Sequence, residues 1–519
     1  MKTPFRNEPL TDFNVPENVA AFRDALERVL ARLGEHYPLV IGGETITTGE
    51  TFDSLNPANP SQVIGRVSKA TPEMAKRAVQ SAAGAFERWR SVPHDERARY
   101  LFNAASRMRA AKHEFSALMV LEVGKSWAEA DADTAEAIDF MEFYGREMLR
   151  LGPAQPTVPC SDCDNDLYYI PLGVGVVIPP WNFPNAIATG MTAAAIVTGN
   201  TVVLKPASAA PVVAAWMARL FNEDLGLPTG VLNFLPGPGG AVGDALVDHP
   251  LTRFIAFTGS KEVGLRIFER AARPQPGQRW LKRTILEMGG KDAILVDETA
   301  DLDAAAAGIV LSAFGFGGQK CSACSRLIAV AEVYDELLEK VVARARAWQV
   351  GDTSLGPEVR VGPVVDAGAL RKHLEYIETG RREGRLVFGG EAIVHPDGGY
   401  FLQPTIFADV DAEARIAQEE IFGPVLAVIR AADFDEGLAI ANNTEYGLTG
   451  GVYSRRRDRL ERARREFHVG NLYFNRKITG ALVGIEPFGG FNLSGTDSKA
   501  GGSDYLLLFT QAKVVSEKA

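Results

Sequence analysis

The chain has 519 residues, of which 46% are hydrophobic, and its 55 Lys and Arg against 65 Asp and Glu give a formal net charge of −10. This length exceeds one ordinary core and predicts two or three domains. An acidic chain without a block of basic residues argues against a nucleic-acid-binding protein and fits an enzyme of small metabolites.

The N-terminal segment MKTPFRNEPLTDFNVPE has no apolar core and carries acidic residues, which predicts a cytoplasmic protein rather than a secreted one. The longest uncharged stretch, residues 167–204, is broken by prolines and glycines into pieces too short to span a bilayer. We therefore expect no membrane segment.

Helical patterns dominate the first third of the chain. Apolar residues at helical spacing follow Pro16, so residues 1–40 are expected to form a helical appendage. A short β segment is expected near residues 39–52. Thr71 and Pro72 then have the pattern of a helix N-cap and first turn, and helices are expected to continue to about residue 151.

From residue 174, short apolar runs alternate with helical patterns, which is typical of a parallel sheet covered on both faces. We predict a doubly wound dinucleotide-binding domain made of residues 41–150 and 173–288. The predicted strands are 174–178, 201–204, 231–235, 253–257 and 284–286, and the predicted helices are 186–197, 211–225, 241–247 and 260–272.

A second α/β alternation over residues 289–483 predicts a catalytic domain. Residues 151–172 and 484–519 match neither pattern. We expect them to form strands and a tail that are exchanged with a neighbouring subunit.

The four cysteines, Cys160, Cys163, Cys321 and Cys324, are too few for a disulfide framework. Both pairs have C-x2-C spacing, so a four-cysteine zinc site and a redox module are alternatives. The gap between the pairs is far longer than in zinc ribbons, and the seven histidines show no ligand spacing. We expect no metal.

The run FGFGGQKCSACSR, residues 314–326, sets Cys321 behind three glycines that permit close approach of a ligand to the backbone. Lys320 or a helix start is expected to lower the pKa of its thiol. Glu287, in LEMGGK, is placed to act as a base. A sulfur nucleophile and a carboxylate base are what aldehyde oxidation through a thioester requires. The alternatives are a buried structural cysteine and a strand-end carboxylate.

Two further motifs follow predicted strands. In IPPWNFP, residues 178–184, Asn182 is expected to donate to an oxyanion together with the Cys321 backbone N–H, or else to form a turn. In FTGSKEVG, residues 257–264, Ser260 opens a helix whose N-terminus suits a pyrophosphate, or is an ordinary capped helix. The glycine-rich run at 237–243 lacks the dinucleotide-binding spacing.

The motifs WNFP, LKPAS, FTGS, LEMGGK, GGQKC, EEIFGPV, NLYFNR and PFGG occur in this order over about residues 40–515, and with them the chain resembles the aldehyde dehydrogenase superfamily. The resemblance implies an α/β fold with a doubly wound NAD-binding domain, a second α/β catalytic domain and a small β oligomerisation element. It implies Cys321 as the nucleophile, Glu287 as the base for deacylation and Asn182 as the oxyanion donor.

The resemblance also implies NAD as the cofactor. Lys205 and Glu420 match the ligands of its two riboses, Phe422 lies by the nicotinamide, and Trp181 and Ser260 lie by the pyrophosphate. A neutral Ser208, where many NAD-preferring relatives have glutamate, would not repel a 2′-phosphate, so some tolerance of NADP is expected. The expected cofactor-binding residues are Ile178, Trp181, Lys205, Ser208, Gly259, Ser260, Glu420 and Phe422.

Residues 477–502 are similar to the branch of that family that oxidises L-glutamate γ-semialdehyde, formed from Δ1-pyrroline-5-carboxylate, to L-glutamate in the second step of proline breakdown. Backbone and side-chain groups beside the nucleophile would grip a carboxylate, and two phenylalanines would enclose the aliphatic chain. The expected substrate-binding residues are Lys320, Ser322, Gly480, Ala481, Phe183, Phe488 and Glu136.

The partners implied are a second copy of the chain, in a homodimer or hexamer, and a proline dehydrogenase. Other readings stay open: a dehydrogenase for another semialdehyde such as succinate semialdehyde, or a structural protein that keeps the fold. A relative that transfers the acyl group to coenzyme A is disfavoured because Glu287 is present for hydrolysis.

Overall fold

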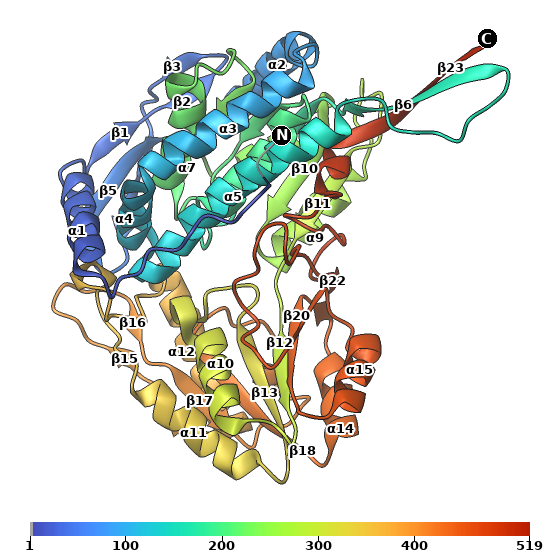
Figure 1. Ribbon diagram of the computed structural model, residues 1–519. Helices are drawn as coiled ribbons and strands as arrows, with labels where there is room; N and C mark the ends of the chain where they lie inside the picture. Colours follow the sequence, from blue (N-terminus) through green and yellow to red (C-terminus); the bar gives the residue numbers. More distant parts are fainter. Residues whose placement is uncertain (1–3, 519) are drawn as a thin grey trace.

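The computed structural model describes residues 4–518 as two α/β lobes with an arm that projects from one of them (Figure 1). The upper lobe in Figure 1 is built mainly from the first half of the chain, and the lower lobe from the second half. Among residues 4–518, no helix combines the length and the apolar character that crossing a bilayer requires.

The sheet of the upper lobe has the strand order β11-β10-β7-β8-β9-β2-β3, with β7 to β11 parallel and β2 antiparallel to both of its neighbours. The order reverses between β7 and β10, and open α/β sheets bind ligands at such a point. Its strands are β7 (Val174–Ile178), β8 (Thr201–Leu204), β9 (Leu232–Phe234), β10 (Thr252–Thr258), β11 (Arg283–Glu287), β2 (Leu39–Ile41) and β3 (Glu44–Ile46).

The helices of this sheet confirm the predicted alternation. The sequence predicted one helix over 211–225; the structure has α7 followed by a π-helical turn, η1. The elements are α6 (Ala186–Val197), α7 (Pro211–Arg219), η1 (Leu220–Asp224), α8 (Gly239–Asp248) and α9 (Lys261–Ala271).

The N-terminal helices pack into the same lobe. Thr71 caps α2 as predicted, by accepting from the backbone N–H of Met74 at 3.3 Å. The structure differs from the predicted boundary at residue 40, because Phe22 of α1 is fully buried with its ring centroid 4.3 Å from that of Trp127. The elements are α1 (Pro16–Leu30), β1 (Glu35–Tyr37), β4 (Thr51–Asn56), β5 (Asn59–Ser68), α2 (Pro72–Trp89), α3 (His94–Ala110), α4 (Lys112–Val123) and α5 (Trp127–Leu151).

The lower lobe holds a second seven-stranded sheet, of order β14-β17-β18-β13-β12-β20-β21, in which only β14 is antiparallel to its neighbour. Its strands are β12 (Asp292–Val296), β13 (Cys324–Val330), β14 (Arg385–Phe388), β17 (Thr405–Ala408), β18 (Val425–Ala431), β20 (Thr449–Tyr453) and β21 (Asn471–Phe474). Its helices are α10 (Leu302–Phe314), α11 (Tyr334–Arg346), α12 (Ala367–Glu383), α13 (Arg415–Gln418), α14 (Phe434–Asn442) and α15 (Arg457–Glu466). Short elements complete it: η2 (Gly315–Gly318), η3 (Thr353–Leu355), β15 (Ala392–Ile393), β16 (Phe401–Leu402), β19 (Tyr446–Gly447) and β22 (Phe491–Asn492). The last short element, η4 (Tyr505–Phe509), packs in the core of the upper lobe.

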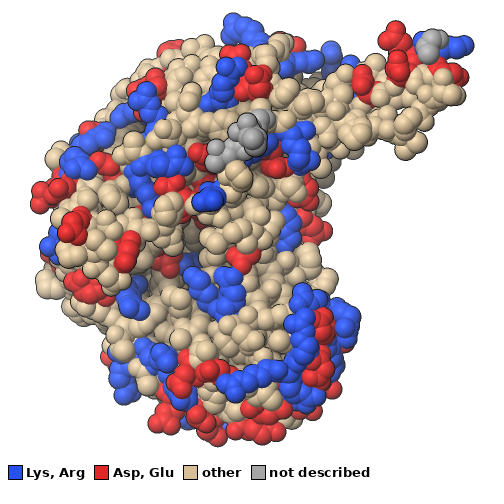
Figure 2. Space-filling model, viewed as in Figure 1, with Lys and Arg blue, Asp and Glu red and all other residues tan. Residues whose placement is uncertain are grey.

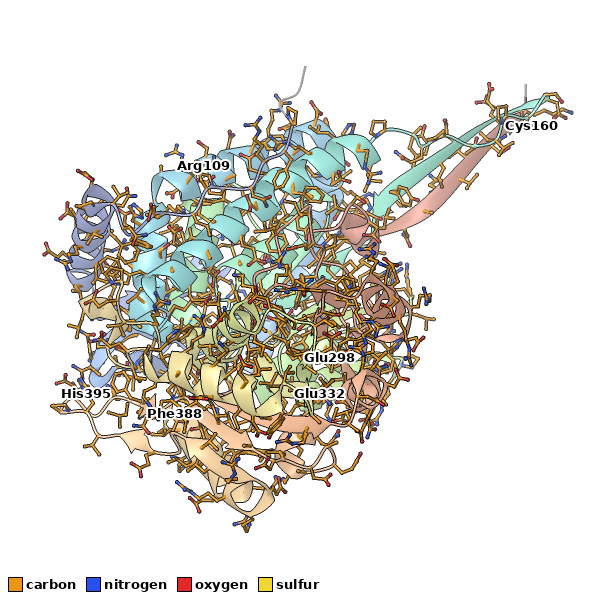
Figure 3. The ribbon with its side chains drawn as sticks, turned by 60° about the horizontal axis from the view of Figure 1, so that its bottom comes forward. Arg109, Cys160, Glu298, Glu332, Phe388 and His395 are labelled. Carbon is orange, nitrogen blue, oxygen red and sulfur yellow. The ribbon has the colours of Figure 1, made fainter. Side chains whose placement is uncertain are left out.

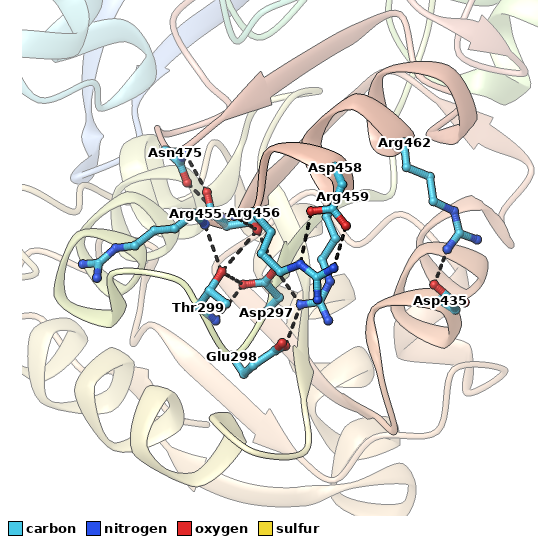
Figure 4. A network of polar contacts seen from close by, with 11 residues as sticks. Asp297, Glu298, Thr299, Asp435, Arg455, Arg456, Asp458, Arg459, Arg462 and Asn475 are labelled. Atoms are coloured by element: carbon cyan, nitrogen blue, oxygen red, sulfur yellow. Dashed lines mark hydrogen bonds and ion pairs between the residues drawn. The ribbon is translucent and has the colours of Figure 1, made fainter.

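Ion pairs fasten the carboxyl edge of β12 to α15 (Figure 4). The buried carboxylate of Asp297 accepts from Ser454 Oγ at 2.5 Å and from Arg459 at 2.8 Å, and Arg459 also contacts Glu298 at 2.6 Å. Most arginines of α15 have a carboxylate partner, and in Figure 2 basic and acidic residues are interspersed over the face shown.

The arm is a two-stranded antiparallel ribbon of β6 (Cys163–Pro171) and β23 (Thr510–Lys518) that leaves the body of the upper lobe (Figure 1). Its register pairs Thr510 with Pro171 and Lys518 with Cys163. Residues 151–172 and 484–519 matched neither domain pattern in the sequence. In the structure β6, from the first segment, pairs with β23, from the second.

Candidate active site

The loop before β13 places Cys321 between the two lobes. It follows α10 and contains Phe316, Gly317 and Gly318 with φ of 52°, 60° and 68°, three successive left-handed residues. A Cβ on Gly318 would lie 2.4 Å from the carbonyl oxygen of Gly423, so only glycine fits. The tight turn thus ends the helix and delivers Cys321 just before the strand.

Cys321 lines a cavity of about 100 Å³ together with Glu287. Residues from both lobes and from the segment 480–505 form its wall, so much of the stretch 484–519 shapes the site and only β23 belongs to the arm. The predicted site residues in its lining are Glu136, Phe183, Glu287, Cys321, Ser322, Gly480, Ala481 and Phe488.

Glu287 is the last residue of β11. Its backbone carbonyl accepts from Gly259 N at 3.0 Å, and its Oε2 accepts from Ser498 Oγ at 3.3 Å. Oε1 is buried and has no partner among the described residues. Burial raises the pKa of this carboxyl well above its usual range, although nearby Lys499 acts in the opposite direction. An acceptor left open in the cavity is suited to take a hydrogen bond from a thiol or a water.

The surroundings of Cys321 favour the protonated form of its thiol. Burial raises its pKa well above the usual value, and the carboxyl groups of Glu287, Asp292 and Glu420 raise it further. The sequence-based prediction that Lys320 lowers this pKa was wrong. The Lys320 ammonium lies 2.7 Å from the Glu129 carboxylate, and this ion pair neutralises its positive charge.

This environment predicts a rising pH profile. Because the thiolate is the nucleophile and the thiol pKa is raised, kcat/KM is expected to increase by up to about tenfold per pH unit through the neutral range. Steady-state rates and the rate of alkylation by iodoacetamide, measured from about pH 6 to about pH 9, should rise in parallel. A profile that is flat for both would contradict a protonated Cys321 in the free enzyme.

Asn182 lies in the loop between β7 and α6. Its side-chain amide is buried and donates to the carbonyl oxygen of Gln319 at 3.0 Å, two residues before Cys321. The second N–H of this amide remains available. This hydrogen bond joins the loop of Asn182 to the segment that carries Cys321. That Asn182 donates to an oxyanion stays a prediction.

Glu136, on α5, also lines the cavity. Burial, and then the neighbouring Asp133, raise the pKa of its carboxyl to about 8. Phe183 and Phe488 supply apolar walls, as expected. Lys320 does not line this cavity.

The sequence did not point to a buried ion pair behind the wall. Lys125 lies 2.7 Å from Asp133 with both side chains fully buried, and its ammonium stands 3.9 Å from the ring centroid of Phe183. Asp133 also accepts from the backbone N–H of Ala186 at 2.6 Å, at the start of α6. The pair therefore fixes Phe183 and the adjoining helix. Nothing in the sequence signals its role, because Asp133 and the start of α6 at Ala186 are 53 residues apart.

The predicted cofactor residues gather at the carboxyl edge of the first sheet. Trp181 packs its ring 5.7 Å from that of Phe422, and Ile178 ends β7. Ser260 caps α9, accepting from Val263 N at 3.4 Å, so its own hydroxyl proton is free to donate beside Gly259.

Two charged residues flank this edge. Lys205 is buried, and burial lowers the pKa of its ammonium to about 8. Among the described residues it donates only to the carbonyl oxygen of Pro206, at 3.3 Å, which leaves donors for a ligand. Glu420 accepts from Gly290 N at 3.0 Å. Buried donors and an acceptor of this kind fit the hydroxyl groups of a dinucleotide's riboses. Ser208, after Lys205, is exposed.

The four cysteines do not form one zinc site. Cys160 is exposed at the tip of the arm (Figure 3), whereas Cys324 is buried and donates from its Sγ to the carbonyl oxygen of Arg326 at 3.4 Å. The two C-x2-C pairs belong to different parts of the molecule.

Comparison with known proteins shows that both the sequence and the structure are similar to those of one enzyme family. The model of the aldehyde dehydrogenase family matches residues 45–515. A 1-pyrroline-5-carboxylate dehydrogenase of Geobacillus sp. (strain WCH70) is 61% identical over 517 residues, covering 100% of both chains. The structure of a 1-pyrroline-5-carboxylate dehydrogenase from Thermus with bound NAD is 56% identical, with a TM-score of 0.97 and 100% coverage of both chains. Proline utilization A from Bdellovibrio bacteriovorus is 46% identical with a TM-score of 0.97, and the match covers 100% of this chain and 54% of that one.

Proposed function

Because the chain belongs to the aldehyde dehydrogenase family, we propose that it oxidises L-glutamate γ-semialdehyde, the open form of Δ1-pyrroline-5-carboxylate, to L-glutamate with NAD as the cofactor. The observation that carries the proposal is the shared cavity of Cys321 and Glu287, with the acidic Glu136 in its lining. The full-length relatives of the same name, at 57% to 61% identity, support the substrate.

In the proposed reaction the Cys321 thiol loses its proton to the solvent and the sulfur adds to the aldehyde carbon. The second N–H of Asn182 donates to the alkoxide that forms. Bound NAD supplies the acceptor for the hydride that leaves this carbon. Cys321 then carries a thioester. Glu287 takes a proton from a water that attacks the thioester, and the products are L-glutamate and the free thiol.

The cofactor is proposed to be held by the edge described above, with Lys205 and Glu420 on the riboses, Ser260 and Gly259 at the pyrophosphate, and Phe422 beside the nicotinamide. Trp181 and Ile178 would complete the apolar wall, and the spare donors of Lys205 support this assignment.

Steady-state oxidation of L-glutamate γ-semialdehyde and of succinate semialdehyde by the same preparation tests the substrate. A clearly higher kcat/KM with the glutamate semialdehyde, and L-glutamate as the product, are expected. A preference for succinate semialdehyde would favour the alternative semialdehyde dehydrogenase.

Glu136→Gln is expected to raise KM for L-glutamate γ-semialdehyde by about 10- to 100-fold, since a charge-assisted hydrogen bond is worth about 1.5–3 kcal/mol. The physical reason is that the substrate's α-ammonium would lower the raised pKa of the Glu136 carboxyl and pair with the carboxylate that forms. Succinate semialdehyde has no ammonium, so its KM should change little. Equal changes with both aldehydes would show that Glu136 only supports the wall.

NADP is expected to be used with lower efficiency than NAD but measurably, because the exposed Ser208 hydroxyl does not repel a 2′-phosphate. Ser208→Glu should lower kcat/KM for NADP by about tenfold or more and leave that for NAD nearly unchanged. No detectable NADP turnover by the unmodified enzyme would contradict this expectation.

We also propose that the protein is a homodimer in which the arm of one chain packs on a second copy of the chain. Such dimers could assemble further into a hexamer. A two-stranded ribbon is marginal by itself, and Val514 and Val515 leave 65% and 42% of their surfaces exposed on it. Val158, in the segment that leads into β6, leaves 87% exposed. Light scattering of the full chain and of one ending at residue 509 would test this. A cytoplasmic location and contact with a proline dehydrogenase belong to the same proposal, the latter supported by the match to a longer proline utilization A.

A further inference from the structure

The tip of the arm carries a cluster of side chains that the proposed reaction does not use. The Sγ atoms of Cys160 and Cys163 are 3.2 Å apart. Oδ1 of Asp162 lies 3.1 Å from the first sulfur and 3.5 Å from the second. Within residues 4–518, this is the one group of three or more Cys, His, Asp or Glu side chains whose ligand atoms all lie within 4.8 Å of one another.

We propose that Cys160, Asp162 and Cys163 form a binding site for a divalent cation of the zinc type, with water as the fourth ligand. Thiolate and carboxylate are ordinary zinc ligands, at about 2.3 Å and about 2.1 Å. A tetrahedral ion with these bonds separates two sulfurs by about 3.8 Å and a sulfur and an oxygen by about 3.6 Å. The three atoms therefore need to move apart by only a few tenths of an ångström.

A disulfide is the alternative use of the two sulfurs. The sulfur–sulfur bond is about 2.05 Å, so the two sulfurs would have to approach by more than an ångström. The carboxylate oxygen near both sulfurs has no part in a disulfide, but it completes a set of three ligands for a cation.

Metal binding at this site exchanges thiol protons for the ion and needs no oxidant. Each S–H bond breaks as a sulfur–metal bond forms, two protons pass to the solvent, and the carboxylate of Asp162 brings its own negative charge. Cys160 and Asp162 are exposed, which gives the ion an entry path and leaves its fourth position to water. The bound ion would close a small ring at the start of β6 and order the tip of the arm (Figure 3).

The test is a titration of the full-length protein, stripped of metal and reduced with a phosphine, first with Co²⁺ and then with Zn²⁺. The expected result is one Co²⁺ per chain with thiolate-to-cobalt charge-transfer absorption, its displacement by Zn²⁺, and release of about two protons per ion. The double variant Cys160→Ser/Cys163→Ser should lose this absorption and keep the dehydrogenase activity. Cys321→Ala should keep the absorption.

Asp162→Asn provides a second variant that leaves both thiols in place. It is expected to weaken zinc affinity by about tenfold or more. The proposal is overturned if the reduced protein shows no thiolate–cobalt absorption, if the double variant retains it, or if Asp162→Asn binds zinc as tightly as the unmodified chain. A Cys160–Cys163 disulfide that persists in phosphine and excludes Co²⁺ would overturn it as well.

Discussion

Replacing Cys321 with alanine is expected to lower kcat by roughly four orders of magnitude or more, because no other described residue brings a thiol into the cavity to form the covalent intermediate. The measurement is NADH formation from L-glutamate γ-semialdehyde at saturating substrate. Binding of NAD, followed by fluorescence quenching, should persist, which would show that the variant is folded.

Cys324→Ala is the matched control. Cys324 lies three residues further on, but its side chain is buried in the core of the lower lobe and does not line the cavity. Turnover should stay within a few-fold of the unmodified enzyme, with a stability loss of about 1 kcal/mol. Equal loss of activity in both variants would mean that the loop, and not the Cys321 thiol, had been disabled.

Glu287→Gln is expected to lower steady-state kcat by about 10²- to 10⁴-fold while the first turnover still forms NADH in a burst. The reason is that the amide cannot take a proton from water, whereas addition of the sulfur and loss of hydride do not need the deacylation base. Stopped-flow absorbance resolves the two phases. The burst should approach one NADH per active site.

Ser498→Ala serves as the control for Glu287. It removes the one side-chain hydrogen bond that the carboxylate makes within residues 4–518, at 3.3 Å, without removing the carboxylate itself. We expect a change in kcat of less than about tenfold. If Glu287→Gln lost the burst and the steady state together, the role of Glu287 would lie before the thioester.

Much of the central fold was predictable from the sequence. The strands Val174–Ile178 and Thr201–Leu204 and the helix Ala186–Val197 have the bounds that the sequence predicted. They are apolar runs that are buried on both sides and are delimited by proline, asparagine and glycine, so local chemistry decides where they begin and end. The helix Pro16–Leu30 was also predicted, but its packing against Trp127 was not, since amphipathicity does not say which surface covers the apolar face.

The site was predictable where short motifs carry it, and not where side chains from distant segments meet. Cys321 and Glu287 stand in such motifs and share the cavity. The predicted direction of the shift in the Cys321 pKa was wrong, because burial and then nearby carboxyl groups raise it. Lys320 does not offset them, since its partner is Glu129, from the other lobe. The sequence shows that Lys320 is next to Cys321. Whether its positive charge acts on the thiol depends on its contacts in space, which the sequence does not show.

The most direct measurement traps the covalent intermediate. Glu287→Gln, mixed with NAD and L-glutamate γ-semialdehyde, quenched in acid, digested and analysed by mass spectrometry, should carry a glutamyl group on the peptide that contains Cys321. The Cys321→Ala/Glu287→Gln double variant should carry none. A glutamyl group on any other residue, or a burst of NADH without an adduct on Cys321, would contradict a thioester formed at this cysteine and hydrolysed by Glu287.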